Sequence, residues 1–149
     1  VICFQSLILD MAGNVGTQSL AVTIRVLMDE NLNGMDKLKL VFKEMKVGFC
    51  NGALLGILAL FCLGLYITLF KGYGFSHALL ISGCVGASLL IAIVISSLVG
   101  TLVPIFFNKI KVDPAVASGP LITTVNDLVA VVTYYGFAWI FLIQIMKIA

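Results

Sequence analysis

Charged residues are scarce in this chain: Asp, Glu, Lys and Arg make up 11% of its 149 residues, whereas 61% are hydrophobic. Soluble domains carry roughly 25% charged residues, so this composition excludes an ordinary water-soluble fold. The net charge of +2 is too small to indicate a nucleic-acid partner. A hydrocarbon core about 30 Å thick needs roughly 20 apolar residues in a helix. We therefore expect an all-α, polytopic membrane helix bundle that occupies residues 1–149 as one domain.

Cysteine and histidine patterns typical of a metal site are also lacking. The four cysteines lie inside apolar runs without a Cys-x-x-Cys spacing, which argues against a disulfide framework or a thiolate metal site. The only histidine, His77, is expected at the membrane interface. The first residues lack the charged region and the cleavage site of a signal peptide, and no initiator methionine is present. We expect the chain to be a piece of a longer protein.

Four apolar stretches remain once the polar turn clusters are removed. The expected spans cover residues of about 1–28, 37–70, 77–107 and 114–145. Asp36 is expected to cap the second helix and Asp113 the fourth, where Asp113 precedes a proline suited to the first helical position. Seven of the nine basic residues lie in or beside the connections that follow the first and third spans, on one side of the membrane: Arg25, Lys37, Lys39, Lys43, Lys46, Lys109 and Lys111. The positive-inside rule therefore places that side in the cytoplasm and both termini outside.

Small residues recur at helical spacing on the second and third spans. The second span carries Gly48, Gly52 and Gly56, and the third carries Ser82, Gly83 and Gly86. Such ladders let membrane helices approach closely. We interpret them as packing surfaces.

Two of the expected spans, the first and the fourth, carry polar side chains at helical spacing that include a carboxylate. On the first span, every fourth residue is polar: Ser6, Asp10, Asn14 and Gln18. On the fourth span the same spacing relates Gly119, Thr123 and Asp127, which Thr124 and Asn126 flank. A spacing of four keeps side chains on one helical face. At about 1.5 Å per residue, Asn14 and Asp127 are expected at a similar depth near the middle of the membrane.

The residue types in these two places suit a hard cation. An ionisable side chain at this depth costs at least about 2.5–3.5 kcal/mol, so it persists mainly where it faces a cavity, a partner or an ion. Oxygen ligands without histidine or thiolate favour Mg²⁺, Ca²⁺ or Mn²⁺. Mg²⁺ sheds water reluctantly, so one carboxylate among polar groups suits a hydrated ion. The alternative is that Asp10 and Asp127 are structural and hold helices together.

Four strings, taken together and in order, resemble the transmembrane domain of the MgtE family of magnesium channels. They are Gly13-Asn14-Val15-Gly16-Thr17-Gln18, Asp113-Pro114-Ala115, Ser118-Gly119-Pro120 and Thr123-Thr124-Val125-Asn126-Asp127. The resemblance covers nearly the whole chain. It implies a five-helix unit, whose first helix has no counterpart here, and a two-fold dimer with a pore along its axis. It assigns Asp127 as the pore ligand of Mg²⁺, with Thr123 and Asn14 beside the hydrated ion.

The expected function is conduction of Mg²⁺, the transported ion, past a mid-membrane aspartate in a homodimer. The candidate ion-binding residues are Asp127, Thr123, Asn14, Asn126, Gly119 and Asp10. The resemblance also implies the lipid bilayer of a bacterial inner membrane and N-terminal cytosolic regulatory domains in the full-length protein.

Two other functions stay open at this point. One is a cation-coupled Mg²⁺ exchanger, which the sequence does not separate from a channel. The other is an intramembrane aspartyl protease, whose Gly-x-Gly-Asp string is missing because Asp127 lies in Asn126-Asp127-Leu128. No Ser/His nucleophile pair or His-Glu-x-x-His string is present either. We therefore expect a transport protein and no enzyme.

Overall fold

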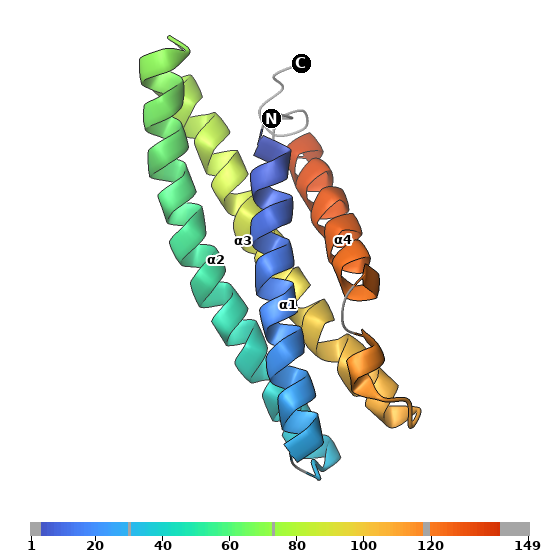
Figure 1. The fold of residues 1–149 in the computed structure, drawn as a ribbon. Coiled ribbons are helices and arrows are strands. Elements are labelled where there is room, and N and C mark those ends of the chain that lie inside the picture. The colour runs from blue at the N-terminus through green and yellow to red at the C-terminus, as the bar shows by residue number, and fades with distance from the viewer. Residues whose placement is uncertain (1–3, 30, 73, 118–119, 141–149) are drawn as a thin grey trace.

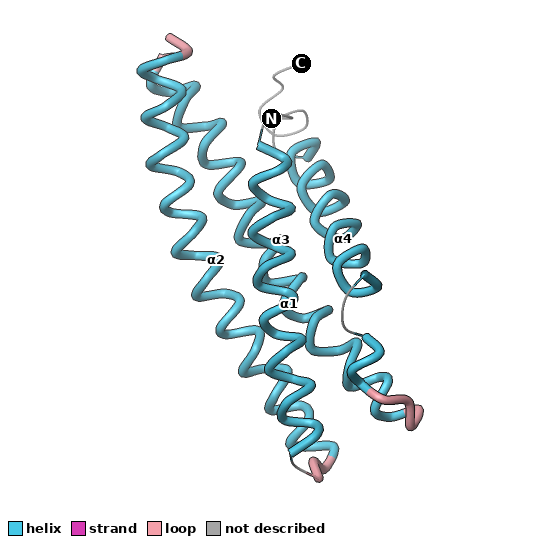
Figure 2. Tube along the Cα trace, in the orientation of Figure 1, coloured by secondary structure: helices cyan, strands magenta, loops and turns pink. Residues whose placement is uncertain are grey.

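The computed structural model describes residues 4–29, 31–72, 74–117 and 120–140. Helix α1 spans Gln5–Asp29, α2 Gly34–Phe70, α3 Phe75–Lys109 and α4 Pro120–Ala138. A short 3-10 helix, η2, covers Pro114–Ala117 between α3 and α4. The four α-helices lie along one bundle, with consecutive helices running in opposite directions (Figure 1). The described residues contain no strand (Figure 2), and the all-α expectation is confirmed.

Three of the described helices, α2, α3 and α4, are long and apolar enough to cross a membrane. Helix α1 has 25 residues, which at 1.5 Å per residue gives a length of about 38 Å. It lies lengthwise against the others in Figure 1, but its polar residues make it less apolar than the other three. The chain is thus a helical membrane bundle, while a fourth span in α1 stays a prediction.

Two helix starts differ from the expectation. Helix α2 begins at Gly34, so its N-cap is Asn33 and the cap proposed for Asp36 is wrong. Asp36 instead lies in the first turn, where one carboxylate oxygen is 3.4 Å from Lys39 Nζ. A carboxylate is favourable there because the first turn carries a partial positive charge.

The fourth expected span, 114–145, is divided. Asp113 does cap a helix, because its Oδ1 accepts a hydrogen bond of 2.9 Å from the Ala115 backbone N–H. That helix is η2, which has only four residues. The longer helix α4 starts at Pro120, consistent with the preference of proline for the first helical position. Residues 118–119 and the expected end of the span at 145 lie outside the described residues.

Glycine contacts join α2 to α3. A Cβ atom added to Gly56 would lie 2.9 Å from the Gly86 carbonyl oxygen, and one added to Gly52 would lie 3.1 Å from the Leu90 backbone. These contacts confirm the packing role of the ladder on α2. Gly83 is different, because a Cβ atom there would have no neighbour within 4 Å. Gly83 lies one residue past Ser82 and so points about 100° away from it, and its expected packing role is wrong.

Hydroxyl groups of α3 tie the other helices together. Ser96 Oγ donates a 2.7 Å hydrogen bond to the Ala12 carbonyl of α1. Ser97 Oγ donates to the Glu44 carbonyl of α2 at 2.8 Å and lies 2.8 Å from Ser19 Oγ of α1. Hydrogen bonds between membrane helices fix their relative rotation. The polar stripe of α1 is therefore held in a defined direction.

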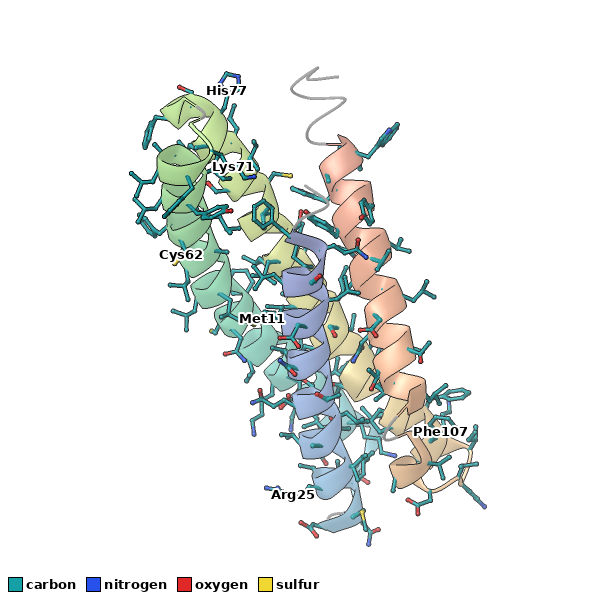
Figure 3. All side chains as sticks on the ribbon, turned by 45° about the horizontal axis from the view of Figure 1, so that its top comes forward. Met11, Arg25, Cys62, Lys71, His77 and Phe107 are labelled. Atoms are coloured by element: carbon teal, nitrogen blue, oxygen red, sulfur yellow. The ribbon has the colours of Figure 1, made fainter. Side chains whose placement is uncertain are left out.

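The ends of the bundle carry the residues that the alternating spans predict. In Figure 3, Lys71 and His77 lie at one end, whereas Arg25 and Phe107 lie toward the other. His77 is exposed at the start of α3, as its expected place at the interface requires.

Candidate functional site

Helices α1 and α4 meet at the level of Asp127. This residue is half-buried, and its Oδ1 lies 3.8 Å from the position that a Cβ atom would take on Gly13. The carboxylate thus lies close to the backbone of α1 at Gly13. Because Gly13 directly precedes Asn14, the polar segments of α1 and α4 meet at the level expected from the sequence.

The polar stripe of α1 faces outward from the single chain. Its members are all exposed: Ser6, Asp10, Asn14 and Gln18. Asn14 Nδ2 donates to Asp10 Oδ2 across 3.5 Å, the upper limit for a hydrogen bond. Thr17 Oγ1 lies 2.9 Å from the carbonyl oxygens of Gly13 and Asn14. The stripe thus presents oxygen and amide groups along one face.

The remaining candidates on α4 lie in different surroundings. Thr123 is exposed and precedes Asp127 by four residues, so both lie on one face of α4. Asn126 is fully buried and lies against Gly16 in the interior. Gly119 lies outside the described residues. We use the name polar face for Asp10, Asn14, Thr123 and Asp127.

The chemistry of the polar face is that of oxygen donors. The described residues contain no group of three or more His, Cys, Asp or Glu that could hold a metal ion. A single chain therefore presents its carboxylate, amide and hydroxyl groups separately on the polar face. Such a set suits a cation that keeps most of its water, because Mg²⁺ in proteins commonly binds through one or two carboxylates and several waters.

Four small residues surround the site, and their contacts were not predicted from the sequence: Gly13, Gly16, Ser96 and Gly100. Gly13 lies beside the Asp127 carboxylate, and a Cβ atom on Gly16 would overlap the Asn126 amide and the Ser96 hydroxyl. A Cβ atom on Gly100 would overlap the Gly16 carbonyl. The available signal was the spacing of three between the glycines of α1 and of four between Ser96 and Gly100 of α3.

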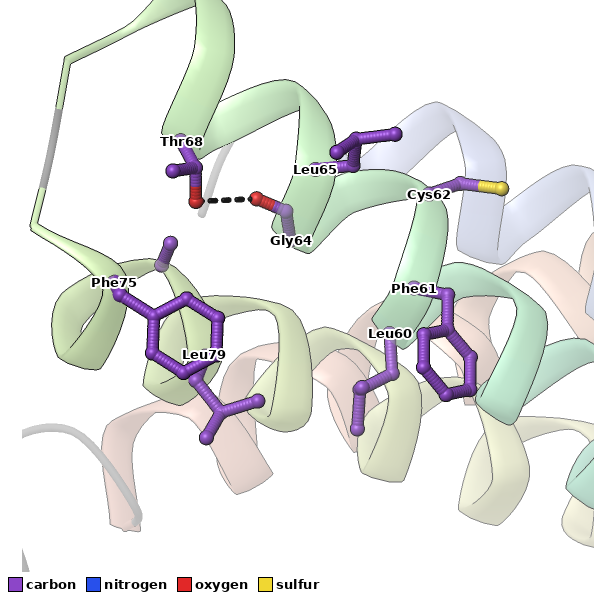
Figure 4. A pocket seen from close by; sticks show the side chains of 9 residues that line it. Leu60, Phe61, Cys62, Gly64, Leu65, Thr68, Phe75 and Leu79 are labelled. Carbon is purple, nitrogen blue, oxygen red and sulfur yellow. Dashed lines mark hydrogen bonds between the residues drawn. The ribbon is translucent and has the colours of Figure 1, made fainter.

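A separate cavity of about 410 Å³ lies between α2 and α3 near their connection. Its walls are apolar side chains, among them Leu60, Phe61 and Phe75 (Figure 4). The Thr68 hydroxyl donates its hydrogen bond to the Gly64 carbonyl at 2.8 Å. A lining of this kind offers no charge to a cation, so the polar face is the better candidate site.

Comparison with known proteins confirms the resemblance to the MgtE family. The MgtE family, described as a divalent cation transporter, matches residues 5–137. The protein "Magnesium transporter MgtE" of Bacillus subtilis is 37% identical over 139 residues, which are 93% of this chain and 29% of that protein. The protein of the same name from Enterococcus faecalis gives the same identity and shares. The one from Thermus thermophilus is 34% identical over 131 residues, 88% of this chain and 27% of that protein. The chain thus spans less than a third of these relatives' length.

Proposed function

Because this chain belongs to the MgtE family, we propose that it is the ion-conducting membrane part of a magnesium transporter and that Mg²⁺ passes Asp127. The relatives are named as magnesium transporters, and the family is one of transporters and not of enzymes. The proposal concerns the full-length protein that contains this chain. The cytosolic regulatory domains implied by the resemblance belong to that same proposal.

The observation that carries the proposal is the exposure of the polar face. Asp10, Asn14 and Thr123 are exposed on the single chain, although they lie on helices of a membrane bundle. Charged and polar groups at this depth are unfavourable in contact with lipid and almost always face a bundle interior or a water-filled cavity. A second subunit that covers this face would give both a partner and an aqueous pathway. We therefore propose a homodimer with the pathway at its two-fold axis.

Charge balance supports the same arrangement. A two-fold axis beside Asp127 brings two carboxylates, with a combined charge of −2, to one divalent cation. Asn14 and Thr123 would then contact the water shell of the ion with an amide and a hydroxyl group, which suits the reluctance of Mg²⁺ to dehydrate.

The orientation in the membrane follows from the basic residues. Four lysines, Lys37, Lys39, Lys43 and Lys46, lie in the first turns of α2. Under the positive-inside rule this end faces the cytoplasm. We propose that the protein lies in a bacterial inner membrane with both ends of this chain on the outer side.

Uptake of Mg²⁺ into liposomes that contain the purified full-length protein tests the function. We expect a Mg²⁺ gradient alone to drive uptake, as in a channel. A strict requirement for an opposing gradient of another cation would instead identify the exchanger. Folded protein that moves no Mg²⁺ under either condition would contradict the proposed function.

A further inference from the structure

Asn126 is a buried polar residue whose position differs from that of the polar face. Its side chain has 0% exposure, and neither Oδ1 nor Nδ2 has a hydrogen-bond partner among the described residues. Most buried side-chain polar atoms in proteins are paired, and leaving one unpaired is unfavourable. An amide in this position therefore calls for an explanation.

The amide lies in a recess where three helices converge. Gly16 of α1 and Gly100 of α3 bring the two backbones together, since a Cβ atom on Gly100 would overlap the Gly16 carbonyl. The missing side chain of Gly16 leaves the space that the Asn126 amide and the Ser96 hydroxyl share. Ser96 uses its proton in the hydrogen bond to Ala12. Its Oγ lone pairs thus remain able to accept a hydrogen bond from Asn126 Nδ2.

The recess adjoins the position of Asp127. Successive residues of a helix point about 100° apart, so the direction of Asn126 determines that of Asp127. Asn126 lies against Gly16, and Asp127 lies against Gly13. The two glycines are three residues apart on α1, which is almost one helical turn. Seating the amide against Gly16 therefore fixes the rotation of α4 that places the carboxylate over Gly13.

We propose that Asn126 is a positioning residue: its amide, enclosed beside Ser96 in the Gly16 recess, keeps Asp127 aimed into the conducting pathway. This inference rests on the proposed function and deepens it, because it assigns Asn126 a role other than contact with the ion. Full burial on the side of α1 and α3 separates this amide from the exposed polar face. Replacing a residue that orients a metal-binding group without contacting the ion typically changes metal affinity by about 10–100-fold.

The test uses Asn126→Leu in the full-length protein, a change that keeps the branching and the number of side-chain heavy atoms and removes both polar atoms. We expect the Mg²⁺ concentration that gives half-maximal uptake to rise by about tenfold or more. The Mg²⁺-induced increase in melting temperature, which measures binding without transport, should shrink in parallel. Asn51→Leu on α2 is the matched control and should leave both quantities unchanged.

Ser96→Ala keeps the test decisive if Asn126→Leu does not fold. Removal of the hydroxyl should raise the Mg²⁺ concentration that gives half-maximal uptake. The double variant should need no higher concentration than Asn126→Leu alone. A solely structural role predicts a lower melting temperature without a change in the half-maximal concentration. Folded variants that keep the parental Mg²⁺ dependence in both assays would overturn the inference. A parent protein that moves no Mg²⁺ would overturn the proposed function instead.

Discussion

At the scale of single residues, the proposed function makes Asp127 the charge on which conduction depends. At 4–5 Å from a divalent ion, across one water shell, a carboxylate contributes on the order of several kcal/mol of Coulomb attraction at an effective dielectric constant near 20. Asp127→Asn keeps the volume and removes this attraction. We expect Mg²⁺ uptake to fall sharply and divalent block of any monovalent current to weaken.

The same variant separates a pore ligand from a structural aspartate. An unpaired carboxylate inside a membrane protein is unfavourable, so Asp127→Asn should fold as well as the parent or better in the absence of Mg²⁺. Melting temperatures measured with and without Mg²⁺, beside uptake, check this. Normal uptake, or unfolding irrespective of the ion, would remove Asp127 from the pathway.

The glycines of α1 give a second pair of variants. A methyl group on Gly13 would lie at ordinary contact distance, 3.8 Å, from Asp127 Oδ1, so Gly13→Ala should fold normally. A methyl group on Gly16 would overlap Asn126 and Ser96, and overpacking of this kind costs about 1–3 kcal/mol. Thermal unfolding should therefore show a lower melting temperature for Gly16→Ala than for Gly13→Ala. Equal melting temperatures would mean that α4 does not pack against Gly16.

At the scale of the helices, the contact between α2 and α3 depends on backbone approach. A Cβ atom on Gly86 would lie 2.7 Å from the Gly56 carbonyl oxygen, whereas one on Gly83 would meet nothing within 4 Å. We expect Gly86→Ala to destabilise the protein by about 1–3 kcal/mol. Gly83→Ala is the control and should be neutral or stabilising by roughly 0.5–1 kcal/mol, because alanine favours the helix. Denaturation in detergent measures both, and a reversed order would contradict this packing.

Thiol labelling tests the proposal that the pathway lies along α1 and α4 and that α2 faces lipid. In a background without the native cysteines, Asn14→Cys and Thr123→Cys should react with a charged, membrane-impermeant reagent because they lie on the polar face. The native Cys62 is exposed on α2 (Figure 3) and, restored alone to that background, should react poorly because its surroundings are lipid. Labelling of Cys62 together with protection of both engineered positions would move the pathway to α2.

The sequence predicts helices better than it predicts helix rotation. The apolar runs place α2 and α3 to within three residues at each end, because hydrophobic length alone decides a membrane helix. The division between η2 and α4 was not predicted. Asp113-Pro114 does start a helix, but that helix is η2, which ends after four residues. The spacing of four also places Asn14 and Asp127 on polar faces. It does not show that Asn126 points inward, because that direction depends on Gly16 and Gly100, which lie far away in the sequence.

At the scale of the whole molecule, the proposed homodimer accounts for the exposure of the polar face. Asp10 and Asn14 are exposed in the single chain, and one Asp127 supplies half the charge of a divalent cation. A homodimer about a two-fold axis resolves both, because an interface of this symmetry places the same residue of each subunit across the axis. Mass measurement in detergent or lipid should therefore give a dimer.

Mixing subunits tests whether both copies of Asp127 act on one ion. Parent and Asp127→Asn chains, expressed together in equal amounts, give about a quarter of dimers with two aspartates and half with one, if they assemble at random. When each ion needs both carboxylates, uptake should fall to about a quarter of the parental value, whereas independent pathways in each subunit predict about a half. The control mixes parent with Asn51→Leu chains and should retain full uptake. A residual activity of one half, together with the mass of a monomer, would place the pathway inside a single chain and leave the exposed polar face without its explanation.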